Sequence, residues 1–465
     1  MSSCGHLHFS SNGLTAGLGA LLEKPAYVLY DPSLRSSLVV ALTAAGLRDA
    51  VVAAPAQANA LQERGFVLAE DLSQRYRNQT DDVIFRDARD RYLAACNGSL
   101  IVWMGGACGA NMQPGIADYG VARKAFFVDL NTDPNATLSV GNGTAEYALA
   151  DEIVATLSQR SDQDFLLQGW HSYCKDEEHT FTTLASRHGG CVHGLNTNPN
   201  LSFLSALDVT PGFKFRNNPA PRINATITDK VVVAFVQTDG LGLGAWNGAA
   251  RGQVPYTWEV TLPDLWIQPA LLEIFYREAT ALDYFVAALG GPGYMYSNAV
   301  PPAQRQRLLH KAQQAMLQLD LHEMVTFDAS RAEGQHTVTG NTNLSPSAVA
   351  AYFEDMNETR FWFNGYAPTF TAARDESGTT ARSLLSFEYY LDPSRSVSDV
   401  LTDLELLAQL NAQRPYFLAV HVREFASQST VVELVEKLPR DFLVTAADQF
   451  AQLANAHGTF RTRYA

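Results

Sequence analysis

The sequence predicts an α/β protein, with a small parallel α/β domain at the N-terminus followed by a distorted (β/α) barrel of about seven strands. Short apolar runs alternate with amphipathic stretches, which is typical of parallel sheets joined by crossover helices. The alternation restarts on a larger scale after residue 229. A chain of 465 residues is also too long for one ordinary core, which indicates two domains.

The N-terminal domain is expected over residues 1–160. Its predicted strands are 26–30, 50–54, 66–69, 100–104 and 125–129, with helical stretches at 33–46 and before Gly65. The glycine-rich segment Gly105–Gly109 follows the fourth strand, where it could cradle a phosphate at a helix N-terminus. It lacks both the GxGxxG spacing and the Walker lysine, so we interpret it as a loop and expect no cofactor.

A connecting segment is expected over residues 161–229. It contains an unusual group of possible zinc ligands, namely His171, Cys174, His179, His188, Cys191 and His193. Of the five cysteines, Cys174 and Cys191 are the pair we expect to form a disulfide, because a short turn-rich segment separates them. The run 215–222, with its prolines and asparagines, is interpreted as a linker into the next domain.

The second domain is expected over residues 230–465. Predicted strands lie at 231–237, 284–289, 324–328, 360–363, 384–390, 416–422 and 442–445. Helices are predicted at 267–282, 303–321, 346–356, 397–412, 431–438 and 446–456. This order fits a closed or nearly closed (β/α) barrel, and an open doubly wound sheet is the alternative.

Polar residues lie at the ends of several predicted barrel strands, where barrel proteins place their active sites. They are Asp239, Asp328, Asn364, Glu388 and His421. Asp239 is the strongest candidate, because it follows an apolar strand and precedes three closely spaced glycines that leave room for a ligand. Helix capping is the simpler interpretation of the acidic residues, and a core position is the simpler one for His421.

The segment Gly291–Tyr296 reads Gly-Pro-Gly-Tyr-Met-Tyr and directly follows an apolar run. Tyr294 and Tyr296 would project the same way from an extended loop, and such rings suit the apolar face of a sugar. An ordinary turn with two half-buried tyrosines is the alternative. Trp246, Trp258 and Trp362 are further candidates for stacking on sugars, although core packing is expected to take at least two of them.

This motif, with residues 283–287 before it, resembles the GxGYxYP family of putative glycoside hydrolases. Segments 231–240, 271–280, 415–422 and 438–450 are also similar to that family, and the resemblance spans roughly residues 165–455. Two positions differ from the family pattern. Leu241 stands where the family has the second acid of an Asp-Gly-Asp-Asn turn, and the proline after the motif is displaced to Pro301–Pro302.

The resemblance implies a carbohydrate substrate and hydrolysis by two carboxyl groups that flank the scissile bond. The possible pairs are Asp239 with Asp328 and Asp239 with Glu388. The resemblance also implies that the His- and Cys-containing segment shapes a cleft rather than holding metal. Leu241 leaves open a glycan-binding protein without catalysis, and Asp239 with His421 leaves open a metal-dependent, deacetylase-like hydrolase.

Composition limits the partners and suggests a compartment. A net charge of −14 argues against nucleic acid and anionic membranes as main partners, and no apolar run is long enough to span a bilayer. Eight Asn-x-Ser/Thr sequons favour a secretory route, although no leader is visible. We therefore expect an extracytoplasmic glycoprotein, whose oligomeric state the sequence does not indicate.

Overall fold

The computed structural model describes residues 25–106, 116–135, 143–160, 164–194, 200–218, 227–330, 337–338, 341–365, 371–423 and 426–462. The chain forms two compact units. The first comprises Met1–Arg160 with Gln168–Glu177, and the second comprises Ser161–Leu167 with Glu178–Ala465. The expected connecting segment 161–229 is therefore divided between the units. Residues 107–109 of the glycine-rich segment and 219–222 of the expected linker lie outside the described residues.

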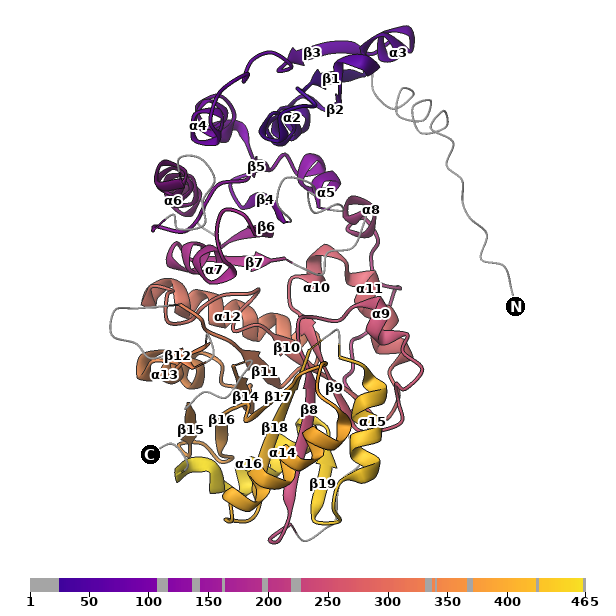
Figure 1. The fold of residues 1–465 in the computed structure, drawn as a ribbon, viewed down its shortest axis with the longest axis vertical. Helices are drawn as coiled ribbons and strands as arrows, with labels where there is room; N and C mark the ends of the chain where they lie inside the picture. The colour runs from indigo at the N-terminus through magenta and orange to yellow at the C-terminus, as the bar shows by residue number, and fades with distance from the viewer. Residues whose placement is uncertain are drawn as a thin grey trace, which may run out of the picture. The chain divides into compact units, whose positions relative to one another are not determined.

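The first unit contains small parallel sheets (Figure 1). In one of them β1 (Ala26–Leu29) pairs with β2 (Ala50–Ala53) and β3 (Val67–Asp71). In the other, β4 (Leu100–Gly106) lies between β5 (Phe126–Val128) and β6 (Phe165–Ser172). Every residue of β4 is buried, as expected for a central parallel strand. The helices of this unit are α2 (Arg35–Arg48), α3 (Ala58–Glu63), α4 (Asp81–Tyr92), α5 (Ala117–Ala122) and α6 (Gly143–Arg160).

One glycine allows β4 and β6 to approach closely. Gly169 has φ of +107°, and a Cβ there would lie 2.0 Å from the carbonyl oxygen of Trp103. Only glycine fits such a position, because it tolerates the backbone angle and has no Cβ.

The second unit is built on a sheet with ten strands among the described residues, in the order β15-β16-β14-β11-β10-β9-β8-β18-β17, with β19 paired to β8. β15 runs antiparallel to β16, and the other pairs are parallel. The strands are β8 (Val231–Gln237), β9 (Tyr256–Thr261), β10 (Asp283–Ala288), β11 (Glu323–Thr326), β14 (Phe361–Asn364), β15 (Ala372–Asp375), β16 (Arg382–Ser386), β17 (Tyr389–Leu391), β18 (Tyr416–Val422) and β19 (Phe442–Thr445). β7 (Gly190–His193) and the hairpin of β12 (Thr337–Val338) and β13 (Asn341–Thr342) also belong to this unit.

The helices of the second unit are α7 (Glu178–Arg187), α8 (Leu201–Leu204), α9 (Leu243–Trp246), α10 (Asp264–Ile267), α11 (Pro269–Glu278), α12 (Pro302–Gln318), α13 (Pro346–Asp355), α14 (Val397–Leu410), α15 (Gln428–Lys437) and α16 (Ala447–His457). Local sequence sets where several of these helices begin. Ser345, Ser396 and Ser427 each accept a hydrogen bond from a backbone N–H of the following helix. Proline occupies the first turn of α11, α12 and α13, where its missing N–H is tolerated.

The sheet curls into a half-barrel. The predicted strand 384–390 is in fact two strands, because β16 ends at Ser386 and β17 begins at Tyr389. These strands lie near opposite ends of the strand order. Three residues of chain span at most about 11 Å, so the two sides of the sheet must approach each other. The predicted fold class, a parallel α/β domain followed by a distorted barrel, is confirmed.

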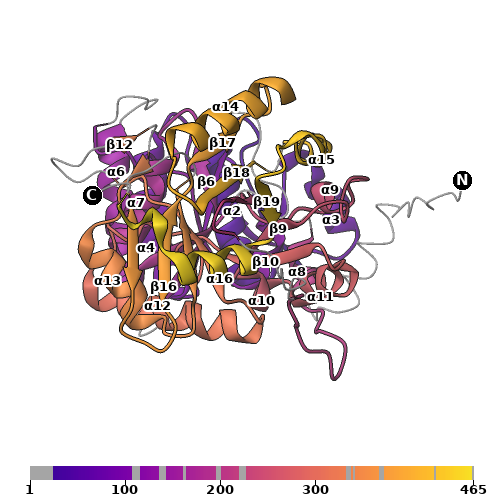
Figure 2. The ribbon, with the colours of Figure 1, turned by 90° about the horizontal axis from the view of Figure 1, so that it is seen from below.

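Both faces of the curled sheet are packed. Alternate strand residues such as Val233 and Phe235 join a large hydrophobic cluster with Leu308 and Met316 of α12. On the other face, α16 contacts β8, β10, β11, β16 and β19 and lies between β16 and β10 in Figure 2. Phe450 of α16 packs there against a set of buried rings, namely Phe361, Phe363 and Phe417.

Candidate functional site

Asp239 and Arg423 form an ion pair at the carboxyl edge of the curled sheet. Their strands are in register, because Gln237 of β8 pairs with Val422 of β18. The carboxylate of Asp239 lies 2.5 Å from Nε of Arg423, and their side chains are 9% and 28% exposed. Asp239 has φ of +70° and Gly240 has φ of +83°. A left-handed Asp is uncommon, and such strain concentrates at functional sites.

A second carboxyl group, Glu259, lies directly beneath this turn. Its Oε2 accepts a hydrogen bond of 3.1 Å from the backbone N–H of Gly240. Burial, followed by the nearby charge of Asp239, raises the pKa of Glu259 well above the ordinary value for glutamate. Oε1 has no hydrogen-bond partner among the described residues. Asp239 and Glu259 are thus the carboxyl groups that the structure brings together.

Glu259 was not predicted, because the strand that carries it was not predicted. β9 reads Tyr-Thr-Trp-Glu-Val-Thr, an alternation rich in β-branched and aromatic residues. Trp258 and Val260 join the hydrophobic cluster, whereas the hydroxyl of Thr257 accepts a hydrogen bond from Ala447 N of α16. Glu259 shares the α16-facing side of the sheet with Thr257, since side chains alternate along a strand. A lone acid in such an alternation is the signal that could have identified it.

His421 is a buried residue of β18. Its Nε2 lies within hydrogen-bond distance of the hydroxyl of Thr238, and its ring contacts Phe387 and Tyr390. The structure pairs Asp239 with Arg423 rather than with His421. Across the described ranges, no group of three or more His, Cys, Asp or Glu side chains is arranged to hold a metal ion.

The tyrosines of the Gly291–Tyr296 segment form a second cluster at this edge. The backbones of Tyr294 and Val192 exchange two hydrogen bonds of 2.8 Å. The Tyr294 hydroxyl donates to Oε1 of Glu178 at 2.5 Å and lies 2.9 Å from the Tyr296 hydroxyl. Tyr296 is fully buried, and burial raises its pKa well above the ordinary value for tyrosine. Tyr294 keeps 8% exposure, so of the two phenols it is the one nearer to solvent.

Asp328 lies beside the tyrosine cluster. It accepts hydrogen bonds from the backbone N–H groups of Asn298 and Ser330, at 2.8 and 3.0 Å, and from the Ser330 hydroxyl. Burial raises the pKa of Asp328 to about 6, although these hydrogen bonds oppose the shift. The pKa of Tyr296 is raised mainly by burial and then by the charge of Glu178, and the charge of Asp328 adds a smaller increase. The neighbouring Phe327 stacks on Tyr294 with ring centres 6.1 Å apart.

Glu388 lies apart from Asp239. Its backbone N–H donates to the carbonyl of Ala419, and its carboxylate accepts from the hydroxyl of Tyr416, at the amino end of β18. Ala419 is level with Ala234, which is five residues before Asp239 along the chain. Asp239 lies beyond the carboxyl end of β8, whereas the Glu388 carboxylate bonds a side chain from the amino end of the neighbouring β18. The structure therefore does not bring the pair Asp239 and Glu388 together.

Three predicted sugar-binding residues are core residues in the structure. Trp246 is buried against Trp258 and Phe275 and donates to Glu278 at 2.9 Å. Trp362 is fully buried against the rings of Tyr352 and Phe353. Asn364 is fully buried, and its Oδ1 accepts from the Thr326 hydroxyl at 2.7 Å. Apolar area at these ring positions is used for packing, so it is not presented to a ligand.

The His- and Cys-containing segment does not form one cluster. Cys174 is disulfide-bonded, whereas Cys191 is a buried free thiol, so the expected bridge between them is wrong. The two residues belong to different compact units, and Cys191 packs into the core of the second. His193 is hydrogen-bonded to Asp264 at 3.1 Å, and His171 interacts with Asp176 at 3.2 Å.

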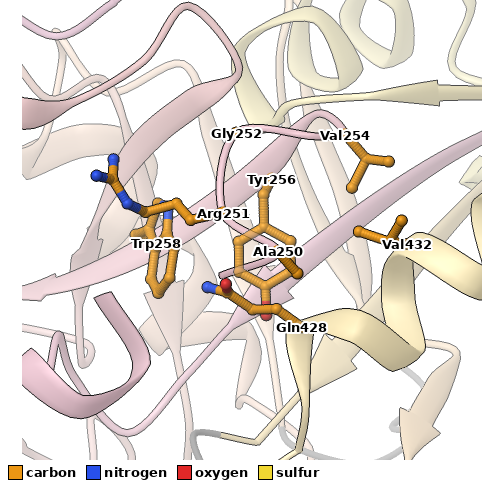
Figure 3. Close-up of a pocket in the computed structure, with 8 residues that line it drawn as sticks. All are labelled: Ala250, Arg251, Gly252, Val254, Tyr256, Trp258, Gln428 and Val432. Atoms are coloured by element: carbon orange, nitrogen blue, oxygen red, sulfur yellow. The ribbon is translucent and has the colours of Figure 1, made fainter. Parts of the chain in front are cut away.

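A small cavity lies between Arg251, Tyr256, Trp258 and Gln428 (Figure 3). Its volume is about 10 Å³, enough for about one water molecule. It contains none of the carboxyl groups described above and is far too small for a sugar ring. Within the described ranges, none of the helices has both the length and the apolar character that a membrane span requires.

The fold and the site define the class: an α/β protein with a curled (β/α) barrel and acidic side chains at the carboxyl edge of its sheet. The chain belongs to the GxGYxYP family. Residues 229–455 match its "GxGYxYP putative glycoside hydrolase C-terminal domain", residues 98–206 its "third domain", and residues 25–96 its "N second domain". A comparison with curated protein sequences gives no match.

Two solved structures are similar to this chain. A crystal structure described as a "putative hydrolase" from Bacteroides thetaiotaomicron matches with a TM-score of 0.75 and 18% identity, over 95% of this chain and 83% of that chain. A "putative polysaccharide deacetylase" from Mycobacterium smegmatis matches with a TM-score of 0.33 and 13% identity, over 52% of this chain and 96% of that chain. The first match supports the fold. The TM-score of the second match is too low to support a common fold.

Proposed function

We propose that this protein is a carbohydrate-active hydrolase that cleaves a glycosidic bond, with Asp239 as the reacting carboxylate. The observation that carries the proposal is the placement of Asp239. It stands on a left-handed turn at the carboxyl edge of a curled (β/α) sheet, and Arg423 holds it as an ion pair. A fixed, charged carboxylate at that edge is what stabilisation of an oxocarbenium-like transition state requires.

Hydrolysis also needs a carboxyl group that carries a proton at the working pH. Asp328 meets the chemical requirement, because burial raises its pKa to about 6. It follows β11, three strands from β8 in the strand order, and lies at the same carboxyl edge of the curled sheet as Asp239. We assign to Asp328 the role of acid, which donates a proton to the leaving-group oxygen.

Tyr294 supplies the contact to the sugar. Its hydroxyl is held by Glu178 and Tyr296, so the ring is fixed before any ligand binds. A preorganised phenol adds a hydrogen bond at little entropic cost. The family description supports a carbohydrate as the substrate.

One observation favours a second function, glycan binding without catalysis. Leu241 replaces an acid of the family pattern, and its side chain packs against the hydrophobic cluster, where a carboxylate would be costly to bury. In that case glycans would bind but would not be cleaved.

The test is reducing-end release from a panel of oligosaccharides, measured for the wild type, Asp239→Asn and Asp392→Asn. Asp392 holds Ser394 in a surface turn and serves as the matched control. We expect hydrolysis of at least one glycan by the wild type and the control, and loss of hydrolysis in Asp239→Asn. Equal rates for Asp239→Asn and the wild type would remove Asp239 from the mechanism. Binding of a panel glycan without release by any variant would establish the second function.

The proposal extends to the compartment. Four of the sequon asparagines, Asn78, Asn135, Asn200 and Asn357, are exposed. The disulfide at Cys174 also suits an oxidising environment. We infer an extracytoplasmic glycoprotein. Mass spectrometry of the protein from its natural source, before and after enzymatic removal of N-linked glycans, would show a decrease in mass; an unchanged mass would contradict glycosylation.

A further inference from the structure

We propose that Glu259 is a positioning residue of this site, which holds the Asp239–Gly240 turn from within the sheet and thereby fixes the carboxylate of Asp239 beside Arg423. The inference rests on the proposed function, and it assigns a role to a residue on a strand that the sequence patterns did not identify. Three features of the structure support it: the geometry of the turn, the burial of Glu259 and the balance of charge around it.

The geometry places Glu259 where the turn needs an acceptor. Asp239 and Gly240 are both left-handed, and such a turn persists only when its surroundings hold it. The backbone N–H of Gly240 is fixed by Oε2 of Glu259 at 3.1 Å. The N–H of Asp239 also contributes a hydrogen bond to this carboxyl group. One side chain of β9 therefore sets the backbone of the residue that carries the reacting carboxylate.

Burial and charge favour the neutral form of Glu259. The charged groups that act on it are Asp239, at the end of β8, and Arg423, at the end of β18. The guanidinium of Arg423 already pairs with Asp239. A second buried carboxylate would be left without a cation of its own, which is unfavourable. Burial and the charge of Asp239 accordingly raise the pKa of Glu259 well above 4.5.

A neutral Glu259 makes the turn sensitive to pH. The folded-state pKa is raised, so the contribution of Glu259 to stability is present at low pH and is lost as the pH rises through that pKa. When Glu259 ionises, it repels Asp239 across the turn that it holds. The proposed activity is then expected to decline on the alkaline side as the turn loosens, although Glu259 itself transfers no proton.

The first experiment compares urea unfolding of the wild type and Glu259→Gln from pH 4 to pH 9. Glutamine keeps the acceptor for Gly240 N–H and cannot ionise. We expect equal urea midpoints at pH 4 and a higher midpoint for Glu259→Gln at alkaline pH. Glu436→Gln, an exposed position on α15, is the control and should follow the wild type throughout. If the midpoints of the wild type and Glu259→Gln differ by the same amount at every pH, the pKa of Glu259 is not raised in the folded state, and this part of the proposal is wrong.

The second experiment measures hydrolysis of a panel glycan against pH for Glu259→Gln and Glu259→Ala. We expect Glu259→Gln to retain turnover within about threefold of the wild type and to lose part of its alkaline decline. Glu259→Ala leaves Gly240 N–H without its acceptor, and we expect at least a tenfold loss of turnover. Loss of turnover in Glu259→Gln equal to that in Glu259→Ala would show that Glu259 donates a proton, which overturns the positioning role. If the wild type cleaves no glycan, the proposed function fails, and the unfolding experiment still decides the charge state of Glu259.

Discussion

Asp239 and Arg423 are joined at 2.5 Å across the ends of two paired strands. The parallel register of β8 and β18 places the two residues just beyond the last paired residues, Gln237 and Val422. Strand pairing thus brings the two residues to the same place at the edge of the sheet. A charge held this way is preorganised, which is the property that electrostatic catalysis requires.

Replacement of Arg423 should reveal how much the ion pair contributes. Arg423→Gln leaves the mostly buried carboxylate of Asp239 without its cation, and breaking such a pair is costly. We expect a loss of about 2 kcal/mol in the free energy of unfolding, measured in urea at pH 7. Arg395→Gln is the control, because Arg395 pairs with Asp403 at the surface and should contribute less than about 1 kcal/mol. Equal effects of the two substitutions would contradict a structured site.

The pH dependence of hydrolysis should reflect Asp328. The protonated form of Asp328 survives up to a pH of about 6, because burial raises its pKa to about 6 from 3.8. If Asp328 donates the proton, turnover falls as the pH rises through that value. Asp328→Asn should lose turnover at every pH. A wild-type rate that stays constant from pH 5 to pH 8 would assign the acid to another residue.

The hydroxyl of Tyr294 should affect substrate binding more than stability. Tyr294→Phe removes the hydrogen bonds to Glu178 and Tyr296 and keeps the ring. We expect KM to rise by about tenfold, equivalent to about 1.4 kcal/mol, with kcat reduced less. Tyr276→Phe removes a buried hydroxyl that donates to Leu319 O and should change stability without changing KM. An unchanged KM in Tyr294→Phe would remove the tyrosine cluster from the sugar site.

Gly293 should be intolerant of a side chain. A Cβ at this position would lie 2.9 Å from Cβ of Cys191 and 3.1 Å from the carbonyl oxygen of Val192. Gly293→Ala should therefore cost about 1–3 kcal/mol through overpacking. Gly242→Ala, for which the space is open, should have little effect on urea unfolding. Equal stability of the two variants would mean that the motif turn is loosely packed.

Much of the architecture could be predicted from the sequence because apolar runs mark buried parallel strands clearly. β8, β10 and β18 are such runs, and Asp239 was identified because it ends one of them. β9 was not predicted, since its polar Thr257 and Glu259 interrupt the apolar pattern. Glu259 is one of these two polar residues. It weakens the strand pattern in the sequence, and it is also the side chain that holds the turn.

Other residues could not be placed without coordinates. Trp246, Trp362 and Asn364 are candidates by residue type, and only packing shows that they are buried. Glu388 lies between two strands that pair with opposite sides of the sheet, a break that the apolar run 384–390 conceals. At that break the side chain of Glu388 points toward Tyr416, whose hydroxyl it accepts a hydrogen bond from, and not toward Asp239.

Chemical rescue tests the role of Asp239 most directly. Asp239→Gly suits the left-handed backbone at this position and leaves room for a small carboxylate. We expect this variant to lose glycan hydrolysis by at least about a hundredfold and to regain part of it when formate is added. Wild-type turnover in Asp239→Gly without formate would show that the reaction needs no carboxylate at the end of β8.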